Sequence, residues 1–207
     1  MNKGIFVSFE GGEGGGKSTL IKMLEQYLCS LGFRVTIFRE PGGVCISEEI
    51  RSILLYKGME PLTELLLYAA SRAQLVPQAL QPALKENDFV LSDRFMDSNE
   101  AYQGYGRNLD LKMVKEVVAL STNGIRPQVT YLLDLDPKIG VMRASAVTIT
   151  RVEEESLNFH NRVRKGFLAI AEREPGRIVK IDASKDLKTV FGLIITDFTH
   201  RFLEKTR

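Results

Sequence analysis

Tryptophan is missing from this sequence of 207 residues, and cysteine is scarce, with only Cys29 and Cys45. The two cysteines lack the paired spacing of a metal site, and no secretory leader precedes the first strand-like run, so we expect a reduced, cytoplasmic protein. Long hydrophobic runs are absent as well. Because a membrane-spanning helix needs about 20 apolar residues, the sequence predicts no such helix.

Charge of one sign is also lacking, since 28 Lys and Arg stand against 26 Asp and Glu and the net charge is +2. So small an excess argues against a polymeric nucleic acid as a partner, and any phosphate recognition must be local. The hydrophobic content of 44% over 207 residues is enough for one substantial core. Because no linker or repeat divides the chain, we expect residues 1–207 to form a single domain.

Short runs rich in branched residues alternate with longer segments of helical periodicity. We predict strands at 5–9, 35–38, 89–92, 129–135 and 178–181. We predict helices at 17–30, 46–56, 62–86, 111–121, 153–172 and 187–202. This alternation is typical of an α/β protein with a parallel sheet, and strands this apolar should be buried on both faces.

A phosphate-binding pattern, G-x-x-x-x-G-K-[ST], follows the first predicted strand and opens the first predicted helix. Its residues are Gly11, Gly12, Glu13, Gly14, Gly15, Gly16, Lys17, Ser18 and Thr19. Glycines let the backbone curve around an anion, Lys17 reaches the terminal phosphates, and Ser18 ligates magnesium. The pattern predicts binding of a nucleotide together with Mg²⁺. The sequence lacks D-x-x-G and N-K-x-D, the elements that a GTPase uses, so a small-molecule kinase is favoured.

Further blocks follow the phosphate-binding pattern in a fixed order. They are REPGG at 39–43, LLLYAASRAQ at 65–74, DRFMDSNEAYQG at 93–104, LLDLDP at 132–137 and FHNRVRKGF at 159–167. With these blocks the chain resembles the bacterial thymidylate kinase family over most of its length. The resemblance implies a P-loop nucleotide kinase fold, with a five-stranded parallel sheet flanked by helices and a short lid at about 143–155. It also implies a homodimer that transfers the terminal phosphoryl group of ATP to dTMP, giving dTDP and ADP, in dTTP synthesis.

The resemblance also implies roles for residues at matching positions. Arg94 would grip the acceptor phosphate, for which a guanidinium offers two parallel hydrogen bonds, and Lys17 would share the catalytic task. Asp93 would contact Mg²⁺ through water, beside Ser18. The implied substrate-binding residues are Glu13, Arg39, Pro41, Tyr68, Arg72, Arg94, Asn99, Tyr102 and Gln103.

Tyr68 and Arg72 lie one helical turn apart, which suits stacking on a base and bonding to its carbonyl. Tyr102 resembles the tyrosine that crowds a ribose 2′-hydroxyl, which would favour deoxyribose. Without the motif, Tyr68 would be a half-buried core aromatic, Arg72 a surface ion pair and Asp93 a strand-end cap.

The predicted lid departs from the family pattern. When the phosphate loop has no arginine, as here, the family supplies one from the lid, but Val147 occupies a usual arginine position and Thr150 replaces a usual aspartate. Arg143 and Arg151 are the remaining candidates for the catalytic arginine. Arg143 could instead be a surface cation at the end of a helix, and Arg151 could instead pair with the glutamates at 153–155. Two other functions stay open: a kinase for another monophosphate or a deoxynucleoside, and a protein that binds ATP without chemistry.

Overall fold

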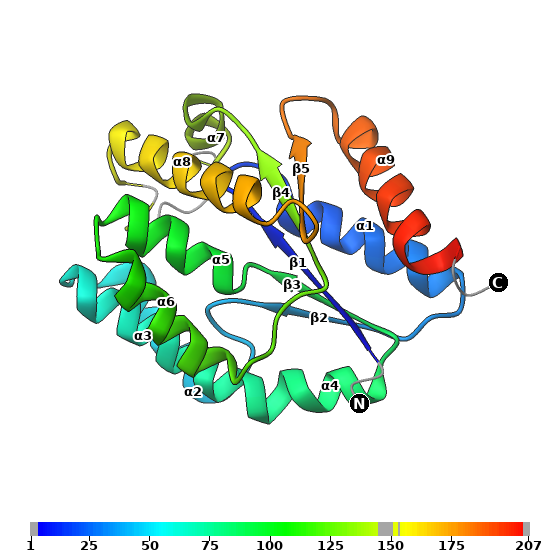
Figure 1. Ribbon diagram of the computed structural model, residues 1–207, viewed down its shortest axis with the longest axis horizontal. Coiled ribbons are helices and arrows are strands. Elements are labelled where there is room, and N and C mark those ends of the chain that lie inside the picture. Colours follow the sequence, from blue (N-terminus) through cyan, green and yellow to red (C-terminus); the bar gives the residue numbers. More distant parts are fainter. Residues whose placement is uncertain (1–3, 145–150, 153, 205–207) are drawn as a thin grey trace.

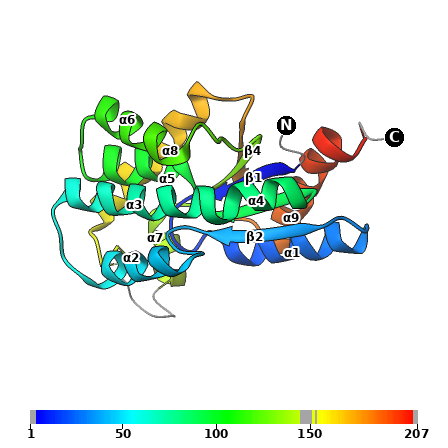
Figure 2. The ribbon, with the colours of Figure 1, turned by 90° about the horizontal axis from the view of Figure 1, so that it is seen from below.

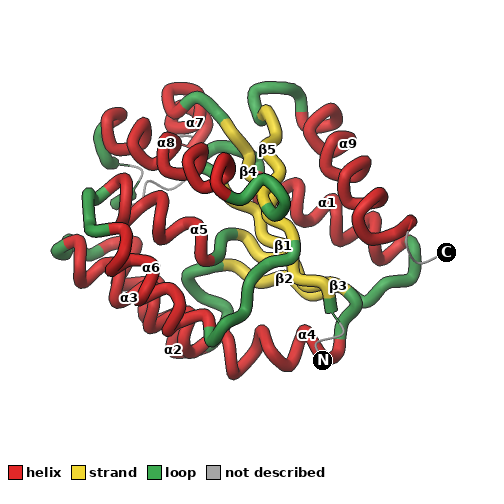
Figure 3. The backbone as a smooth tube through the Cα atoms, viewed as in Figure 1, coloured by secondary structure: helices red, strands yellow, loops and turns green. Residues whose placement is uncertain are grey.

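Five parallel strands form the centre of the molecule in the order β2-β3-β1-β4-β5 (Figure 1). The computed structural model describes residues 4–144, 151–152 and 154–204. The strands are β1 (Ile5–Glu10), β2 (Val35–Arg39), β3 (Phe89–Asp93), β4 (Val129–Asp134) and β5 (Ile178–Asp182). The predicted α/β class and the five-stranded parallel sheet flanked by helices are confirmed (Figure 3).

Helices cover both faces of this sheet. The described α-helices are α1 (Lys17–Ser30), α2 (Cys45–Tyr56), α3 (Pro61–Leu75), α4 (Gln81–Glu86), α5 (Met96–Asn99), α6 (Leu111–Thr122), α7 (Pro137–Ala144), α8 (Leu157–Arg173) and α9 (Leu187–Phe198). Three π-helical turns continue helices: η1 (Val76–Leu80), η2 (Glu100–Gly106) and η3 (Thr199–Leu203). Helices α1 and α9 lie on one face, and α4, α5 and α8 lie on the other (Figure 1). No described helix is long and apolar enough to cross a membrane.

Three parts of the helix prediction were wrong. The helix predicted at 62–86 is α3, η1 and α4 in one row (Figure 2), because Pro77 and Pro82 donate no backbone N–H and interrupt the α-helical ladder. The helix predicted at 153–172 begins only at Leu157, because the Ser156 side chain accepts a hydrogen bond from the Phe159 N–H and caps it there. The segments α5–η2 and α7 were not predicted as helical. Of the predicted lid, Val147 and Thr150 lie outside the described residues.

Burial of the strands depends on their place in the sheet. The central strands β1, β3 and β4 are almost wholly buried, as predicted. The edge strands β2 and β5 are largely half-buried or exposed, so the prediction of burial on both faces was wrong for them. Each edge strand has a neighbour on one side only, which leaves its other side open.

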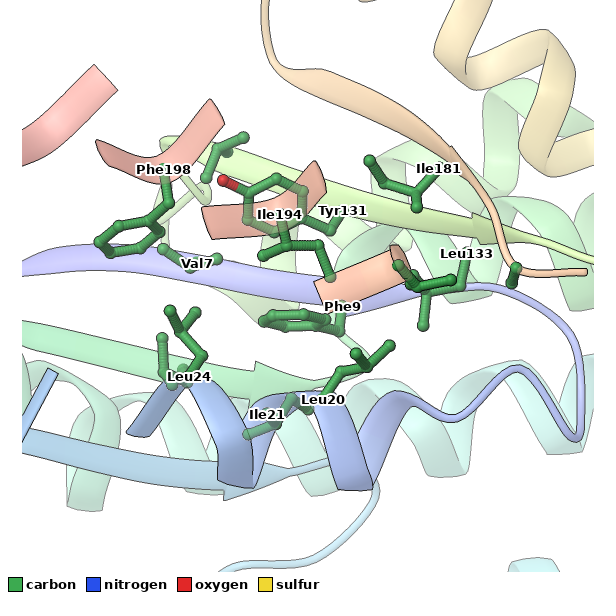
Figure 4. Close-up of a cluster of buried hydrophobic side chains, with 14 of the residues drawn as sticks. Val7, Phe9, Leu20, Ile21, Leu24, Tyr131, Leu133, Ile181, Ile194 and Phe198 are labelled. Carbon is green, nitrogen blue, oxygen red and sulfur yellow. The ribbon is translucent and has the colours of Figure 1, made fainter. Parts of the chain in front are cut away.

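The largest hydrophobic cluster fixes the start of α1 against β1. Leu20, Leu24 and Leu28 recur at every fourth position of α1 and are buried there. Figure 4 shows Leu20 and Leu24 of this row beneath β1, on the side of Phe9 opposite Ile194 of α9. Because β1 and α1 are both held by this cluster, the chain between them is fixed at its two ends.

Strand register sets which loops meet. Phe9 of β1 pairs with Asp93 of β3, and Arg39 of β2 also pairs with Asp93. All strands are parallel, so the loops that follow β1, β2 and β3 leave from the same edge of the sheet. The segments that carry the candidate site residues therefore converge on this edge.

Candidate active site

The loop between β1 and α1 follows a course that needs glycine. Gly14 has φ +67°, and a Cβ there would lie 2.3 Å from the Gly140 carbonyl oxygen of α7. Gly11 has φ +137°, and a Cβ there would lie 2.5 Å from the Leu133 carbonyl oxygen. No other residue type fits either position, so the loop passes close beneath β4 and α7 with its backbone N–H groups at the start of α1.

Lys17 lies across this loop. Its ammonium donates to the Gly12 carbonyl at 2.7 Å and to the Gly11 carbonyl at 3.3 Å, and the residue is buried. Burial lowers the pKa of Lys17, and the nearby Arg94 lowers it further. The cation is therefore held at the loop with partners that phosphate oxygens can replace.

Ser18 and Asp93 provide two adjacent oxygens at the loop. The Ser18 hydroxyl donates to Asp93 Oδ2 at 2.6 Å, joining the first turn of α1 to the end of β3. Within the described part of the chain, no group of three or more His, Cys, Asp or Glu is arranged to hold a metal ion. Two oxygens suit Mg²⁺, which keeps several waters and takes its remaining ligands from phosphates.

Arg94 contacts the phosphate loop from the turn that follows β3. Its backbone has φ +69°, which is rare for a residue with a side chain. One terminal nitrogen donates to the Gly11 carbonyl at 2.9 Å, and the other donates to Glu13 Oε1 at 2.7 Å. The guanidinium also lies over the Tyr102 ring, 5.0 Å from its centre.

Glu13 is ionised by its neighbours. Burial alone would raise the pKa of this carboxyl, but Arg94, Lys17 and the Tyr102 hydroxyl outweigh burial and lower the pKa to about 2. The Tyr102 hydroxyl donates to Glu13 Oε1 at 2.8 Å. The loop thus carries a fixed negative charge next to two fixed cations.

Two adjoining cavities open at this edge of the sheet. The inner cavity, of about 180 Å³, is lined by Glu13, Glu40, Pro41, Arg51, Leu55, Tyr68, Arg72, Arg94, Phe95, Ser98, Asn99, Tyr102, Gln103 and Val152. The loop cavity, of about 380 Å³, is lined by residues 13–19 with Arg39, Glu40, Arg51, Asp93, Arg94 and Arg143. Four residues line both cavities: Glu13, Glu40, Arg51 and Arg94.

A buried ion pair forms one wall of the inner cavity. Arg72 donates to Glu40 Oε2 at 2.5 and 2.8 Å and to the Asn99 side-chain oxygen at 2.5 Å. Both charged side chains are under 5% exposed. Glu40 Oε1 is buried and, among the described residues, has no hydrogen-bond partner. Tyr68 lies one turn before Arg72 on α3, and burial, with Glu64 nearby, raises its pKa to about 12, so its hydroxyl stays protonated.

A sequence model of the thymidylate kinase family matches residues 9–194. The chain belongs to this family. A thymidylate kinase of Thermoanaerobacter sp. (strain X514) is 44% identical over 203 residues, covering 97% of this chain and 100% of the relative. One of Geobacillus sp. (strain WCH70) is 47% identical over 199 residues, covering 93% and 95%. The crystal structure of thymidylate kinase from Ehrlichia chaffeensis at 2.15 Å resolution aligns with a TM-score of 0.77 and 30% identity over 94% of this chain and 98% of that one.

The structure gathers most of the residues predicted for a thymidylate kinase site. Those on the inner cavity are Glu13, Pro41, Tyr68, Arg72, Arg94, Asn99, Tyr102 and Gln103. Arg39 lies instead on the loop cavity, where it donates to the Pro41 carbonyl and to Glu48. The alternative that Arg72 is a surface ion pair was wrong, because its pair with Glu40 is buried. The roles of these residues stay predictions.

The two candidate lid arginines lie in different places. Arg143, in the last turn of α7, lines the loop cavity. Arg151 lines neither cavity and donates to Glu64 Oε2 at 2.6 Å. Glu64 is a buried carboxylate of α3 that also accepts from Gln103 and Arg107. Of the alternative partners predicted for Arg151 at 153–155, Glu153 lies outside the described residues, and the pair that the described residues show is with Glu64.

Sequence reasoning missed several residues in and beside the candidate site. Glu40 lies inside the REPGG block, and the sequence analysis gave it no role. Its position between a strand end and a proline was the available signal that this carboxylate has an ion-pair partner. Arg51 lies on α2, where nothing in the periodicity separates it from a surface cation. Glu64 and Arg107 form an ion pair although they lie 43 positions apart in the chain, and no short sequence pattern predicts a pair at that separation.

We expect Glu40→Ala to lower the free energy of unfolding by about 3–5 kcal/mol, because it leaves the Arg72 guanidinium buried without its carboxylate. Chemical unfolding in urea measures the change. The control is Arg34→Ala, which breaks the exposed pair with Asp88, keeps the hydrogen bond from the Arg34 backbone N–H to Asp88, and should cost at most about 1 kcal/mol. Equal costs for the two variants would contradict the assignment of Glu40 as the charge partner of Arg72.

Proposed function

We propose that this chain is an ATP-dependent dTMP kinase, which transfers the terminal phosphoryl group of ATP to dTMP and releases dTDP and ADP. Membership in the thymidylate kinase family supports the reaction and the acceptor. The observation that carries the assignment of the site is that Glu13, Glu40, Arg51 and Arg94 line both cavities at once. Two anionic substrates in adjoining cavities would meet at these residues. We also infer that residues 1–207 act as one kinase domain.

The loop cavity and a third cavity beside it suit the donor nucleotide. This third cavity, here called the side cavity, has a volume of about 250 Å³ and adjoins the phosphate loop at Gly15 and Gly16. Its other lining residues are Leu20, Arg143, Ala183, Lys185, Asp186, Leu187 and Val190. We assign the triphosphate of ATP to the loop cavity and its base to the side cavity, where apolar side chains and two cations border the space.

Mg²⁺ would be held at Ser18 and Asp93, and when bound it would neutralise charge on the phosphates. The described residues offer two oxygens there, 2.6 Å apart, which fits an ion that also takes ligands from water and phosphate.

We assign the inner cavity to dTMP because of its polar groups. Arg94 and Arg51 border the loop cavity, so we place the acceptor phosphate beside them. Tyr68, Arg72 and Asn99 lie farther from the loop, where a ring, a guanidinium and an amide can bind a pyrimidine. Tyr102 donates to Glu13 between these two regions, and we assign to its ring the task of excluding a ribose 2′-hydroxyl.

No covalent intermediate is needed, because an acceptor phosphate oxygen is already a nucleophile. The task of the protein is to align two anions and to offset their repulsion. Lys17 is fixed to the loop, and Arg94 is fixed between the two cavities by Gly11 and Glu13. Because these cations are oriented before the substrates meet, little reorganisation accompanies transfer.

We expect ADP release that depends on Mg²⁺ and on dTMP, with slower release for dUMP, dCMP, dGMP, AMP and thymidine offered separately. Lys17→Ala should lower kcat by about 100-fold or more, since one oriented cation at the transferred group is lost. Lys22→Ala, an exposed lysine on the same helix, is the control and should keep the wild-type rate. Binding of ATP with no ADP release for any acceptor would instead identify a binding protein.

The arginine that acts on the donor phosphates is proposed to be Arg143. It borders the loop cavity, whereas the Arg151 guanidinium is already paired with the buried carboxylate of Glu64. We therefore expect Arg143→Ala to lower kcat by about 100-fold or more, within the range of other cationic residues in phosphoryl transfer. Lys138→Ala, an exposed cation on the same helix, should have no effect. A larger loss in Arg151→Ala than in Arg143→Ala would reverse the assignment.

The homodimer implied by the resemblance is also proposed here. Exposed apolar side chains recur on two neighbouring helices, with Ile46 and Ile53 on α2 and Leu62 and Leu66 on α3. Intervals of seven and four residues place each pair on one helix face. Two copies that meet through such a face by two-fold symmetry would each cover the other's apolar side chains.

We expect sedimentation to give a dimer for the wild-type chain and a monomer for Leu66→Glu, because the introduced charge would be buried against its own copy. The control is Leu193→Glu on α9, at a comparably exposed leucine on the other face of the sheet. A Leu66→Glu chain that stays dimeric would place the interface elsewhere.

A further inference from the structure

The turn that carries Arg94 has an unfavourable backbone conformation that its surroundings hold in place. The φ of +69° at Arg94 lies in the left-handed region, which side chains disfavour. This conformation joins the end of β3 to the short helix α5 and directs the guanidinium toward Gly11 and Glu13. A residue that fixes this turn also fixes the position of the guanidinium.

Each backbone polar group around Arg94 has a defined partner. The Arg94 N–H donates to the Phe9 carbonyl of β1 at 3.0 Å. The Arg94 carbonyl accepts from the Ser92 hydroxyl at 2.7 Å. The next N–H, that of Phe95, donates to Glu10 Oε1 at 2.7 Å. The turn is thus tied to the end of β1 through both the backbone and one carboxylate.

Glu10 makes a second contact with the same turn. Its Oε2 accepts from the Ser98 hydroxyl at 2.6 Å, and Ser98 Oγ lies 3.4 Å from an Arg94 terminal nitrogen. The Glu10 carboxylate therefore accepts hydrogen bonds from both ends of the segment from Phe95 to Ser98. Ser98 in turn contacts the Arg94 guanidinium, so it links the carboxylate to that group. The Glu10 side chain is fully buried and lines neither the inner cavity nor the loop cavity.

A buried carboxylate at this position is costly for folding. Burial, reinforced by the Asp97 carboxylate of α5, raises the pKa of Glu10 to about 7, against Ser98, Arg94 and the Phe95 N–H, which lower it. Lys17 of α1 is the other charged group that faces it. The folded protein then binds a proton between pH 4.5 and about 7 that the unfolded chain has lost, so stability falls as pH rises through that window. Stability alone would favour a neutral side chain.

We propose that Glu10 is a positioning residue for phosphoryl transfer, whose carboxylate holds the turn from Arg94 to Ser98 so that the Arg94 guanidinium stays between the two cavities. Glu10 touches no substrate and acts through Arg94. The proposal rests on the proposed function of Arg94 in gripping the acceptor phosphate. Such a role would explain why a buried carboxylate that lowers the stability of the fold occurs at position 10.

The test compares Glu10→Gln and Glu10→Ala with the wild-type chain at pH 8 and saturating ATP and dTMP. Glutamine has the same shape, but its amide nitrogen cannot accept from Ser98, so kcat should fall about 10-fold. Alanine removes both contacts, and a displaced guanidinium should cost about 100-fold in kcat. In urea, Glu10→Gln should be at least as stable as the wild-type chain at pH 8, because the buried charge is gone. A slower but not less stable enzyme separates positioning from a structural role.

A double-mutant cycle with Arg94→Ala tests whether Glu10 acts through Arg94. In the Arg94→Ala background, Glu10→Gln should cause no further loss of kcat, since the group that it positions is missing. Glu100→Gln is the control. Glu100 is a buried carboxylate of η2, paired with Arg173 outside both cavities, and its replacement should leave kcat unchanged in either background.

The possible outcomes are distinct. A wild-type kcat in Glu10→Gln, or a Glu10→Gln loss that is undiminished in the Arg94→Ala background, would overturn the role of Glu10 alone. A wild-type kcat in Arg94→Ala by itself would overturn the proposed function of Arg94, and the role of Glu10 with it.

Discussion

Pairing between β1 and β3 is the contact on which the whole site depends. The register sets Phe9 opposite Asp93, so the phosphate loop after β1 and the Arg94 turn after β3 leave the sheet side by side. Four contacts then join the two segments: Ser18 to Asp93, Arg94 to Gly11 and to Glu13, and Phe95 to Glu10. A shift of one residue in this register would turn every side chain of one strand to the opposite face and separate these partners.

Charges at the site are neutralised within the protein, yet they stay available to phosphate. Lys17 and Arg94 both donate to carbonyls of the phosphate loop, and Arg94 also pairs with Glu13. A phosphate oxygen is a stronger acceptor for these cations than a carbonyl, so an exchange of partners would favour a phosphate in the cavity. The low pKa of Glu13 means that this carboxyl stays charged throughout the exchange and keeps Arg94 oriented.

Sequence reasoning reached the parts of the fold and site that are encoded over short distances. The phosphate loop is nine consecutive residues, and Tyr68 and Arg72 share one helix face, so their proximity follows from spacing alone. Partners brought together by tertiary packing were missed, such as Arg72 with Glu40 and Phe95 with Glu10, which lie 32 and 85 positions apart. The short helices α5 and α7 were missed because a few residues carry too little periodicity to identify a helix.

Charge balance explains why the two lid arginines are not equivalent. Glu64 and Glu155 face Arg107 and Arg151, so two carboxylates meet two guanidinium groups, and Glu64 and Arg107 are largely buried. Moving Arg151 to a phosphate would leave this cluster with an uncompensated negative charge at low exposure, which costs more than a surface charge would. Among the described residues, Arg143 donates to the Ala183 carbonyl and pairs with no carboxylate, so it would leave no buried negative charge behind on turning toward the loop. We therefore infer that a phosphate would recruit the arginine on α7 at the lower cost. Val147 stands at a usual arginine position of the family, which would make Arg143 more important.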